Sequence, residues 1–300
     1  MKGADIMFEW FVRKAIEKMR KEWTRGDDIR DAGLVDPDNV EIIDDINYGD
    51  GSVSNLLTLH RAKIKGKLPV IVDIHGGGYF YGDKERYHYY CSELASYGFA
   101  VVNFNYHLGP DFKFPKPLED TALVFKWLVN NAEEYRLDLN NVFMAGDSAG
   151  AQLVSQYAAL ISNPEYGKLF DFEIERGFKL QAILCNCGMY DVLNDPGNKN
   201  MSFYYGKEWK NKSPRLDVLK YIDSNYPPTM VMTSNGDFLK NNGQPFVDYL
   251  KSRGVETEYR YYDPEGRELG HVFHIAIRTP DAIACNEEEV RFLKEHLNRR

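Results

Sequence analysis

The sequence predicts an α/β fold in which helices flank both faces of a mostly parallel β-sheet. Eight strand-like runs alternate with helical patterns along the 300 residues, and this alternation is typical of a parallel sheet covered on both sides. Several runs are almost continuously apolar, as expected of strands buried on both faces. The first two runs, joined by the turn at Gly49–Gly51, predict an antiparallel hairpin at one sheet edge.

The N-terminal segment predicts an amphipathic helix that packs on the main body. Apolar residues recur there at helical spacing between charges; they are Phe8, Phe11, Val12, Ala15, Ile16, Met19 and Trp23. Residues 24–39 are charged and contain Gly, Asp and Pro, so we expect a loop. We interpret residues 1–39 as an N-terminal cap helix and loop. A lid, a dimer face and a membrane-surface helix stay open as roles for it.

The remaining elements follow in chain order. The predicted strands are Val40–Ile46, Asn55–His60, Val70–Ile74, Ala100–Tyr106, Val142–Ala145, Leu180–Cys185, Thr229–Thr233 and Thr257–Tyr262. The predicted helices are Tyr87–Tyr97, Leu118–Asn131, Ala149–Ile161, Gln244–Arg253 and Glu287–Leu297. Residues 189–227 break the alternation, and so long a stretch without a strand usually marks a functional insertion. We predict a cap insertion at 189–227 on a main domain formed by residues 40–188 and 228–300.

Composition excludes several classes of protein. With 37 Lys and Arg against 45 Asp and Glu, the net charge is −8, which argues against nucleic acid as the partner. No apolar run reaches the length of a membrane span, and charges interrupt the N-terminal segment where a signal peptide would be apolar. The four cysteines are too few for a disulfide scaffold and show no zinc spacing. We therefore expect a cytoplasmic protein with reduced thiols, no metal and no stable membrane insertion.

A pentapeptide in the middle of the chain indicates a catalytic serine. Gly146-Asp147-Ser148-Ala149-Gly150 fits the G-x-S-x-G pattern, and it stands between a predicted strand and a predicted helix. The pattern needs this context, because a sharp strand-to-helix turn lifts the serine hydroxyl out of the sheet. The glycines allow the close backbone approach that the turn requires. We expect Ser148 to be a nucleophile.

A glycine run indicates an oxyanion loop. His75-Gly76-Gly77-Gly78-Tyr79 follows the third predicted strand, and a His-Gly-Gly-Gly run in this place supplies backbone N–H groups to an oxyanion. A phosphate-binding loop is the alternative, but neither G-x-G-x-x-G nor a following Gly-Lys-Ser/Thr is present.

A serine nucleophile needs a base and an orienting carboxylate. Of seven histidines, His271 and His274 follow the last strand, where the order Ser, Asp, His along the chain places the base. We favour His271, which directly follows Gly270 in a loop, over His274, which opens an apolar run. Asp237 follows the preceding strand and is the favoured acid. Asp191, which comes after an earlier strand, is its rival. Both could reach the site, because parallel strands leave their carboxyl ends on one side of a sheet.

Taken in order, these motifs resemble the hormone-sensitive-lipase-like branch of the α/β-hydrolases from about Leu68 to Phe273. The matching segments are His75-Gly76-Gly77-Gly78-Tyr79, Tyr106-His107-Leu108-Gly109-Pro110-Asp111, Phe114-Pro115, Asp120, Gly146-Asp147-Ser148-Ala149-Gly150, Gly236-Asp237 and His271-Val272-Phe273. The resemblance implies an eight-stranded sheet with a helical cap and an oxyanion hole formed by the N–H groups of Gly77, Gly78 and Ala149. The family usually has Gly after the histidine, whereas Val272 follows here.

The predicted activity is hydrolysis of small or short-acyl carboxylic esters without a cofactor. Bulky aromatic residues beside the glycine loop favour a short acyl group, and we expect Tyr79, Tyr81, Tyr190 and Trp209 to contact the substrate. A small-molecule ester is the expected partner, and a homodimer stays open. The alternatives are a non-catalytic binding protein on a hydrolase scaffold and a serine peptidase.

Overall fold

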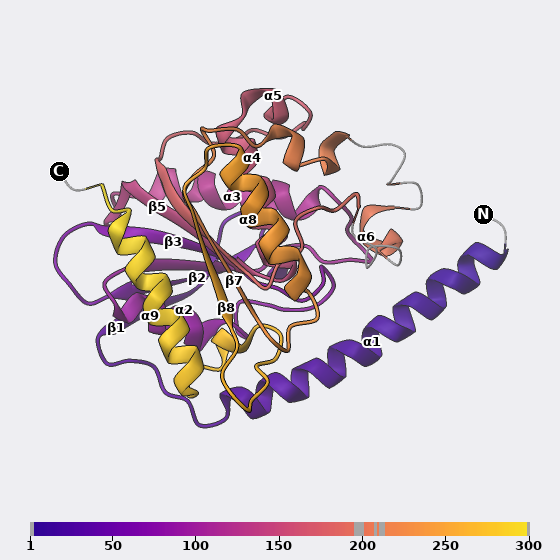
Figure 1. The fold of residues 1–300 in the computed structure, drawn as a ribbon, viewed down its shortest axis with the longest axis horizontal. Coiled ribbons are helices and arrows are strands. Elements are labelled where there is room, and N and C mark those ends of the chain that lie inside the picture. Colours follow the sequence, from indigo (N-terminus) through magenta and orange to yellow (C-terminus); the bar gives the residue numbers. More distant parts are fainter. Residues whose placement is uncertain (1–2, 195–200, 207–208, 210–213, 299–300) are drawn as a thin grey trace.

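Figure 1 shows a computed structural model of the protein, which describes residues 3–194, 201–206, 209 and 214–298. A twisted sheet of eight strands runs through the centre in the order β1-β2-β4-β3-β5-β6-β7-β8. The strands are β1 (Val40–Asn47), β2 (Leu56–Ala62), β3 (Leu68–Ile74), β4 (Ala100–Phe104), β5 (Leu137–Asp147), β6 (Leu180–Asn186), β7 (Thr229–Ser234) and β8 (Thr257–Tyr262). All eight predicted strands are present.

The pairing of the strands confirms the predicted sheet type. The pairs β1–β2 and β2–β4 are antiparallel, and every other neighbouring pair is parallel. The parallel strands β3 to β8 are joined by segments that return across the sheet, so their carboxyl ends share one edge. The predicted α/β fold with a mostly parallel, helix-flanked sheet is therefore confirmed.

Helices cover both faces of the sheet. On one face lie α3 (Lys116–Asn131), α4 (Ala149–Ser162) and α8 (Gly243–Ser252), and on the other lie α2 (His88–Ser96) and α9 (Pro280–Glu295). Side chains of β5 alternate between these layers: Val142 and Met144 join the first cluster, Phe143 and Ala145 the second, and all four are fully buried. This double burial explains the continuous apolar runs in the sequence.

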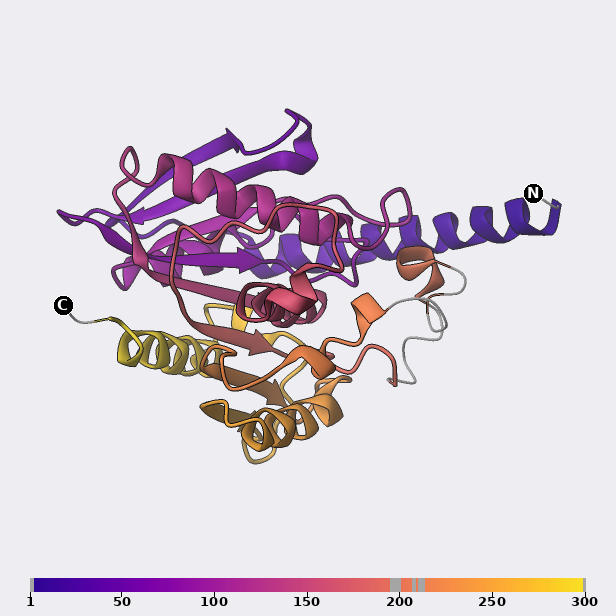
Figure 2. The same cartoon turned by 90° about the horizontal axis from the view of Figure 1, so that it is seen from above.

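Helix α1 (Gly3–Asp31) is longer than predicted and reaches beyond the body of the protein (Figures 1 and 2). The loop expected from residue 24 onward was wrong up to Asp31. Local sequence alone argues against a helix there, because Gly26 and several charges interrupt the apolar pattern. Tertiary contacts favour the helix: Arg30 donates to the carbonyl of Arg86 at 2.6 Å, and Asp27 accepts from the Tyr81 hydroxyl at 2.5 Å.

Two smaller differences concern helix ends and the predicted cap. Helix α9 begins at Pro280 rather than Glu287, because the Thr279 hydroxyl accepts from the Ala282 N–H and caps it. In the predicted cap insertion, the described part contains the short helix α6 (Ser202–Tyr205) and two 3₁₀ turns at Pro214–Leu216 and Leu219–Tyr221. Residues 195–200, 207–208 and 210–213 of that insertion lie outside the described residues.

Candidate active site

The turn between β5 and α4 holds Ser148 in a strained backbone conformation. Its φ of 53° and ψ of −115° lie outside the regions that residues other than glycine usually adopt. The flanking glycines are required for space. A Cβ on Gly146 would lie 2.7 Å from the carbonyl carbon of Gly150, and a Cβ on Gly150 would lie 1.8 Å from the carbonyl oxygen of Ile74. The spacing of the pentapeptide therefore follows from how closely the turn packs.

Strand β6 and helix α9 anchor this turn. The Ser148 N–H donates to the carbonyl of Asn186 at 2.8 Å, and the Asn186 side chain donates to Glu289 at 2.6 Å. Glu289 is fully buried and also accepts from the Tyr90 hydroxyl at 2.8 Å. Burial raises the pKa of Glu289 to about 7, although both donors favour its ionised form. The position of Ser148 thus depends on a buried carboxyl group of the C-terminal helix.

The residue before the serine is a second buried carboxyl group. Asp147 accepts from the Tyr87 hydroxyl at 2.9 Å, and that hydroxyl accepts from the Gly76 N–H at 3.0 Å. Burial raises the pKa of Asp147 to about 6, against the hydrogen bond from Tyr87 and the attraction of His271. Asp147 therefore connects the serine turn to the glycine loop.

The glycine loop leaves two backbone donors free beside the serine turn. Gly77 and Gly78 have φ values of 109° and 59°, and within the described residues neither N–H donates a hydrogen bond. A Cβ on Gly77 would lie 2.1 Å from the carbonyl oxygen of Tyr81, so only glycine fits. The loop is close to the turn, because a Cβ on Gly76 would lie 2.5 Å from Asp147 Oδ2.

Helix α4 contributes a third donor. Ala149 is its first residue, and the first N–H groups of a helix have no acceptor within the helix. The partial positive charge at this helix end also favours an anion. The N–H groups at positions 77, 78 and 149 are thus the type of donors that stabilise a developing oxyanion.

The loops after β7 and β8 bring a carboxylate and an imidazole together. A parallel bridge between Gly236 and Gly270 aligns the two loops, and His271 Nδ1 lies 2.6 Å from Asp237 Oδ1. A carboxylate only accepts hydrogen bonds, so Nδ1 carries the proton and Nε2 of the neutral ring is an acceptor.

The environment keeps Asp237 ionised. Its side chain is fully enclosed, whereas 20% of the His271 side chain is exposed. Burial opposes ionisation of Asp237, but hydrogen bonds from His271 and from the Thr233 hydroxyl outweigh it, so the pKa of Asp237 lies below its usual value. The Leu239 N–H also donates to this carboxylate at 2.8 Å. The imidazole therefore faces a fixed negative charge.

The sheet register places the serine turn beside this pair. Asn186, which binds the Ser148 N–H, is followed by Cys187, and the thiol of Cys187 lies within 4.8 Å of both Asp237 and His271. In the described part of the chain no hydrogen bond joins Ser148 to His271; such bonds often tighten only in the complex with substrate.

The two rival residues lie in other surroundings. Asp191 accepts from the N–H and the side-chain amide of Asn194, and within the described part of the chain no hydrogen bond or ion pair links it to His271 or His274. His274 is buried, with its ring edge-on to Tyr90 at 5.2 Å, and burial lowers its pKa to about 3. The structure therefore pairs Asp237 with His271.

Tyr79 links the glycine loop to the predicted cap. Its side chain is 2% exposed and stacks on Tyr204 at 4.1 Å. Its hydroxyl donates to Gln152 at 2.9 Å and accepts from Tyr205 at 3.2 Å. Because Tyr79 directly follows Gly78, this aromatic wall begins next to the free donors of the loop.

The other predicted substrate residues are spread more widely. Tyr81 is half-buried and donates to Asp27 of α1, so it contacts the N-terminal helix. Trp209 is buried beside Tyr205, with ring centroids 5.1 Å apart. Tyr190 packs in the core against Phe246, and its hydroxyl donates to the carbonyl of Cys185. For all three residues, contact with a substrate stays a prediction.

Sequence reasoning did not identify four residues around the site. Asp147 stands inside the serine pentapeptide, and Asn186 and Cys187 directly follow a predicted strand, so the carboxyl end of that strand was an available signal. Glu289 lies in a helix far along the chain. In the sequence of an amphipathic helix, a buried acid looks the same as an acid that faces solvent.

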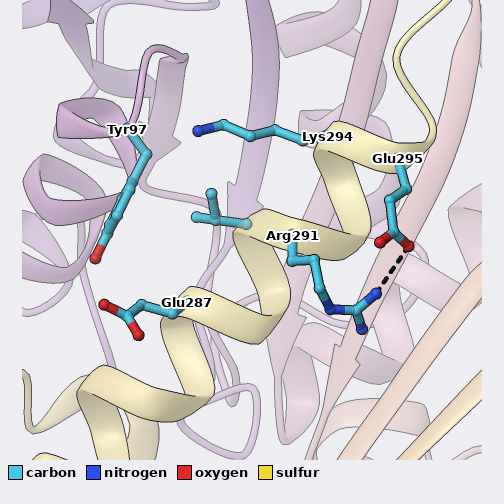
Figure 3. A pocket seen from close by; sticks show the side chains of 6 residues that line it. Tyr97, Glu287, Arg291, Lys294 and Glu295 are labelled. Carbon is cyan, nitrogen blue, oxygen red and sulfur yellow. Dashed lines mark hydrogen bonds and ion pairs between the residues drawn. The ribbon is translucent and has the colours of Figure 1, made fainter.

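A surface pocket of about 430 Å³ lies between α2 and α9, away from these residues. Tyr97 faces Lys294 across it, and Arg291 pairs with Glu295 along its rim (Figure 3). None of the predicted site residues lines it. Among the described residues, no helix is both long enough and apolar enough to cross a membrane.

The model of the BD-FAE family matches residues 58–246. Versiconal hemiacetal acetate esterase of Dothistroma septosporum is 28% identical over 241 residues, covering 73% of this chain and 70% of that protein. Tuliposide A-converting enzyme 1 of Tulipa gesneriana is 26% identical over 253 residues, covering 76% of this chain and 63% of that protein. Matches to such curated relatives span about two-thirds of their length.

Solved structures extend the likeness to nearly the whole chain. Esterase B from Lactobacillus rhamnosis superposes with a TM-score of 0.85 at 25% identity, covering 96% of this chain and 95% of that one. An esterase of Pyrobaculum calidifontis shares the fold, with a TM-score of 0.76 at 23% identity over 93% of each chain. The neighbours are esterases of the α/β-hydrolase fold, which confirms the predicted fold and agrees with the resemblance drawn from the motifs.

Proposed function

We propose that the protein is a serine carboxylic-ester hydrolase. The chain belongs to the BD-FAE family, and a strained serine in a strand-to-helix turn and a His–Asp pair on neighbouring loops support the proposal. In this proposal Ser148 is the nucleophile, His271 the base and Asp237 the orienting acid. The N–H groups of Gly77, Gly78 and Ala149 form the oxyanion hole.

The first half of the reaction forms an acyl-enzyme. Ser148 Oγ attacks the ester carbonyl carbon while His271 Nε2 takes the hydroxyl proton, and the carbonyl oxygen becomes an oxyanion held by the backbone donors. The Asp237 carboxylate stabilises the positive charge that forms on the imidazole. When the oxyanion collapses, the bond to the alcohol breaks and His271 returns the proton to the leaving oxygen.

The second half repeats these steps with water. His271 takes a proton from water, the hydroxide attacks the acyl carbon, and the oxyanion forms again in the same hole. Collapse releases the carboxylic acid, and His271 returns the proton to Ser148. Every proton transfer uses the same imidazole nitrogen, so the tautomer set by Asp237 serves both halves of the reaction.

The observation that carries the proposal is the convergence of three segments distant in the chain. The glycine loop and the serine turn pack so closely that a Cβ on Gly76 would collide with Asp147. The Ser148 N–H donates to Asn186 at the end of β6, and the thiol of the next residue, Cys187, lies within 4.8 Å of Asp237 and His271. A binding protein has no need of free N–H donors beside a strained serine.

Short acyl groups are the proposed substrate class. The buried rings of Tyr79 and Tyr204 and the partly buried ring of Tyr205 form an aromatic wall next to the loop, and buried aromatic rings leave little room for a long chain. Support comes from the relatives, since one is an acetate esterase and a structure of esterase B carries a tributyrin phosphonate. The cytoplasmic location and the homodimer stay predictions.

Hydrolysis of a panel of nitrophenyl esters, from acetate to decanoate, tests the function. We expect the rate to peak between acetate and butyrate and to vanish in Ser148→Ala, and we expect a fluorophosphonate to label the native protein but not this variant. A peak at decanoate would contradict the short-acyl assignment. No hydrolysis of any ester together with no labelling would favour the binding-protein alternative.

A further inference from the structure

A thiol lies beside the proposed base and acid. Cys187 Sγ, one imidazole nitrogen of His271 and one carboxylate oxygen of Asp237 all lie within 4.8 Å of one another. The thiol is almost completely enclosed, with an exposure of 1% for Cys187. The catalytic steps proposed above use His271 and Asp237 and leave this sulfur without a role.

The backbone on both sides of this group is strained. Cys187 has a φ of 49° and Val272 a φ of 53°, which is uncommon for residues with a side chain and unusual for a β-branched one. Such strain persists only where the surrounding packing imposes it. The thiol is therefore held against the His–Asp pair by the packing of two loops.

The three donors match a thiophilic divalent cation. A thiolate, an imidazole and a carboxylate are ligands of Zn²⁺, with bonds of about 2.0–2.3 Å. Tetrahedral bonds of that length place ligand atoms about 3.4–3.7 Å apart, so movements of about 1 Å from the observed spacing would suffice. The exposed part of His271 offers a route from solvent, and water would fill the fourth position.

We propose that Cys187, Asp237 and His271 form a binding site for Zn²⁺ or a similar thiophilic cation, and that occupation of this site inhibits the enzyme. When the metal binds His271 Nδ1 and the Cys187 thiolate, the thiol proton leaves to solvent, and the single ring proton moves from Nδ1 to Nε2 by exchange with water. The imidazole proton then resides on Nε2, where no lone pair is left to accept the proton of Ser148. Inhibition follows from loss of the base and does not require the metal to touch the serine.

Inhibition by added Zn²⁺ tests the proposal, with each variant compared with its own activity in the absence of metal. We expect Zn²⁺ to inhibit the native protein and EDTA to restore activity. Cys187→Ala should raise the half-inhibitory concentration by at least about tenfold, since even the loss of a group that only supports a ligand costs metal affinity about 10–100-fold.

Cys185→Ala is the matched control. Cys185 is also fully buried and lies two positions earlier in the chain, but it belongs to the cluster on the opposite side, near the carbonyl of Ala151. We expect this variant to be inhibited like the native protein. Equal inhibition of Cys187→Ala and the native protein would overturn the proposal. Cys187→Ser replaces Cys187→Ala if the alanine variant does not fold.

A titration with Cd²⁺ tests the metal site independently of the proposed function. Only the inhibition measurements above rest on that function. In Ser148→Ala, Cd²⁺ should produce the ultraviolet absorption of a cadmium–thiolate bond, and the double variant with Cys187→Ala should lack it. Absence of the band in Ser148→Ala would overturn the metal site whether or not the native protein hydrolyses esters. If Ser148→Ala shows the band but the native protein hydrolyses no ester, the metal site is retained and the proposed function is rejected.

Discussion

Two His–Asp pairs of nearly equal length occupy different surroundings in this molecule. His271 Nδ1 lies 2.6 Å from Asp237, and His107 Nδ1 lies 2.8 Å from Asp120. In the second pair the His107 N–H also donates to the carboxylate, and Lys116 lies 2.9 Å from its other oxygen. Asp120 therefore has a permanent cation as its partner, whereas the partners of Asp237 are an imidazole, a hydroxyl and a backbone N–H.

Access to the ring separates the pairs further. A phenylalanine ring lies 4.2 Å from each imidazole, but only 6% of the His107 side chain is exposed. The corresponding exposure of His271 is 20%, and an imidazole nitrogen lies within 4.8 Å of the thiol of Cys187, which directly follows the acceptor of the Ser148 N–H. A close carboxylate orients an imidazole in both places. The ring can act as a base only where its second nitrogen is open to a reacting group.

Replacing the histidine of each pair by alanine should give the largest difference in kcat between the two pairs. We expect His271→Ala to lower kcat by about 10⁵–10⁶-fold, because the serine loses its base, with little change in stability. His107→Ala should change kcat by less than about tenfold and should lower the free energy of unfolding by about 1.5–3 kcal/mol, as a buried hydrogen bond to a charged group is lost.

Ester hydrolysis and urea unfolding of both variants measure these effects. The comparison would be broken if His107→Ala abolished hydrolysis while remaining folded. In that case the enclosed pair, rather than the exposed one, would carry the reaction.

Replacing the aspartate of each pair by asparagine should give the next largest difference in kcat. Asp237→Asn should lower kcat by about 10⁴-fold, because the amide favours the wrong imidazole tautomer. Asp120→Asn removes the nearer of two carboxylate partners of Lys116, so we expect a loss of stability with kcat close to native. Steady-state kinetics and thermal unfolding distinguish these outcomes. If Asp237→Asn had the native kcat, Asp191 would again be a candidate for the orienting acid.

Buried carboxyl groups near the His271 pair should make stability depend on pH. The pKa of Asp147 is about 6 and that of Glu289 about 7, above their unfolded values, so the folded protein binds more protons. Stability is therefore greatest below the unfolded pKa and is lost as pH rises through 6 to 7, by on the order of 1–3 kcal/mol for each group. Asp237, whose pKa is lowered, contributes oppositely, at more acidic pH.

Urea unfolding of the native protein and of Glu289→Gln from pH 5 to 8 measures this dependence. The variant should be less stable at pH 5, since an amide NH2 replaces one of the two Glu289 oxygens that accept from Asn186 and Tyr90, but its stability should fall less steeply with pH. Parallel curves for the two proteins would show that Glu289 ionises normally.

The smallest expected effect concerns the strained residue after His271. Val272 has a φ of 53°, so Val272→Gly should be more stable than Val272→Ala, since both lose the side chain but only glycine relieves the strain, worth on the order of 1 kcal/mol. Differential scanning calorimetry of the two variants checks the order. A higher Tm for Val272→Ala would show that the strain is negligible.

The local elements of the sheet could be predicted from the sequence because each is marked by short-range patterns. Strand β8 begins and ends at Thr257 and Tyr262 as predicted, and the strand-to-helix context of Ser148 follows from an apolar run, two glycines and a helical pattern. The end of α1 could not be predicted, since Arg30 and Asp27 are held by the Arg86 carbonyl and the Tyr81 hydroxyl from across the fold.

The sequence by itself determined the types of residue at the site and their order along the chain, since glycine, serine, histidine and aspartate carry chemistry that no packing can replace. Tertiary structure decided the partners. It paired His271 with Asp237 rather than leaving Asp191 open, placed Cys187 against that pair, and left His107 enclosed beside Asp120. Partner choice depends on sheet register and loop geometry, which arise from contacts between residues far apart in the chain.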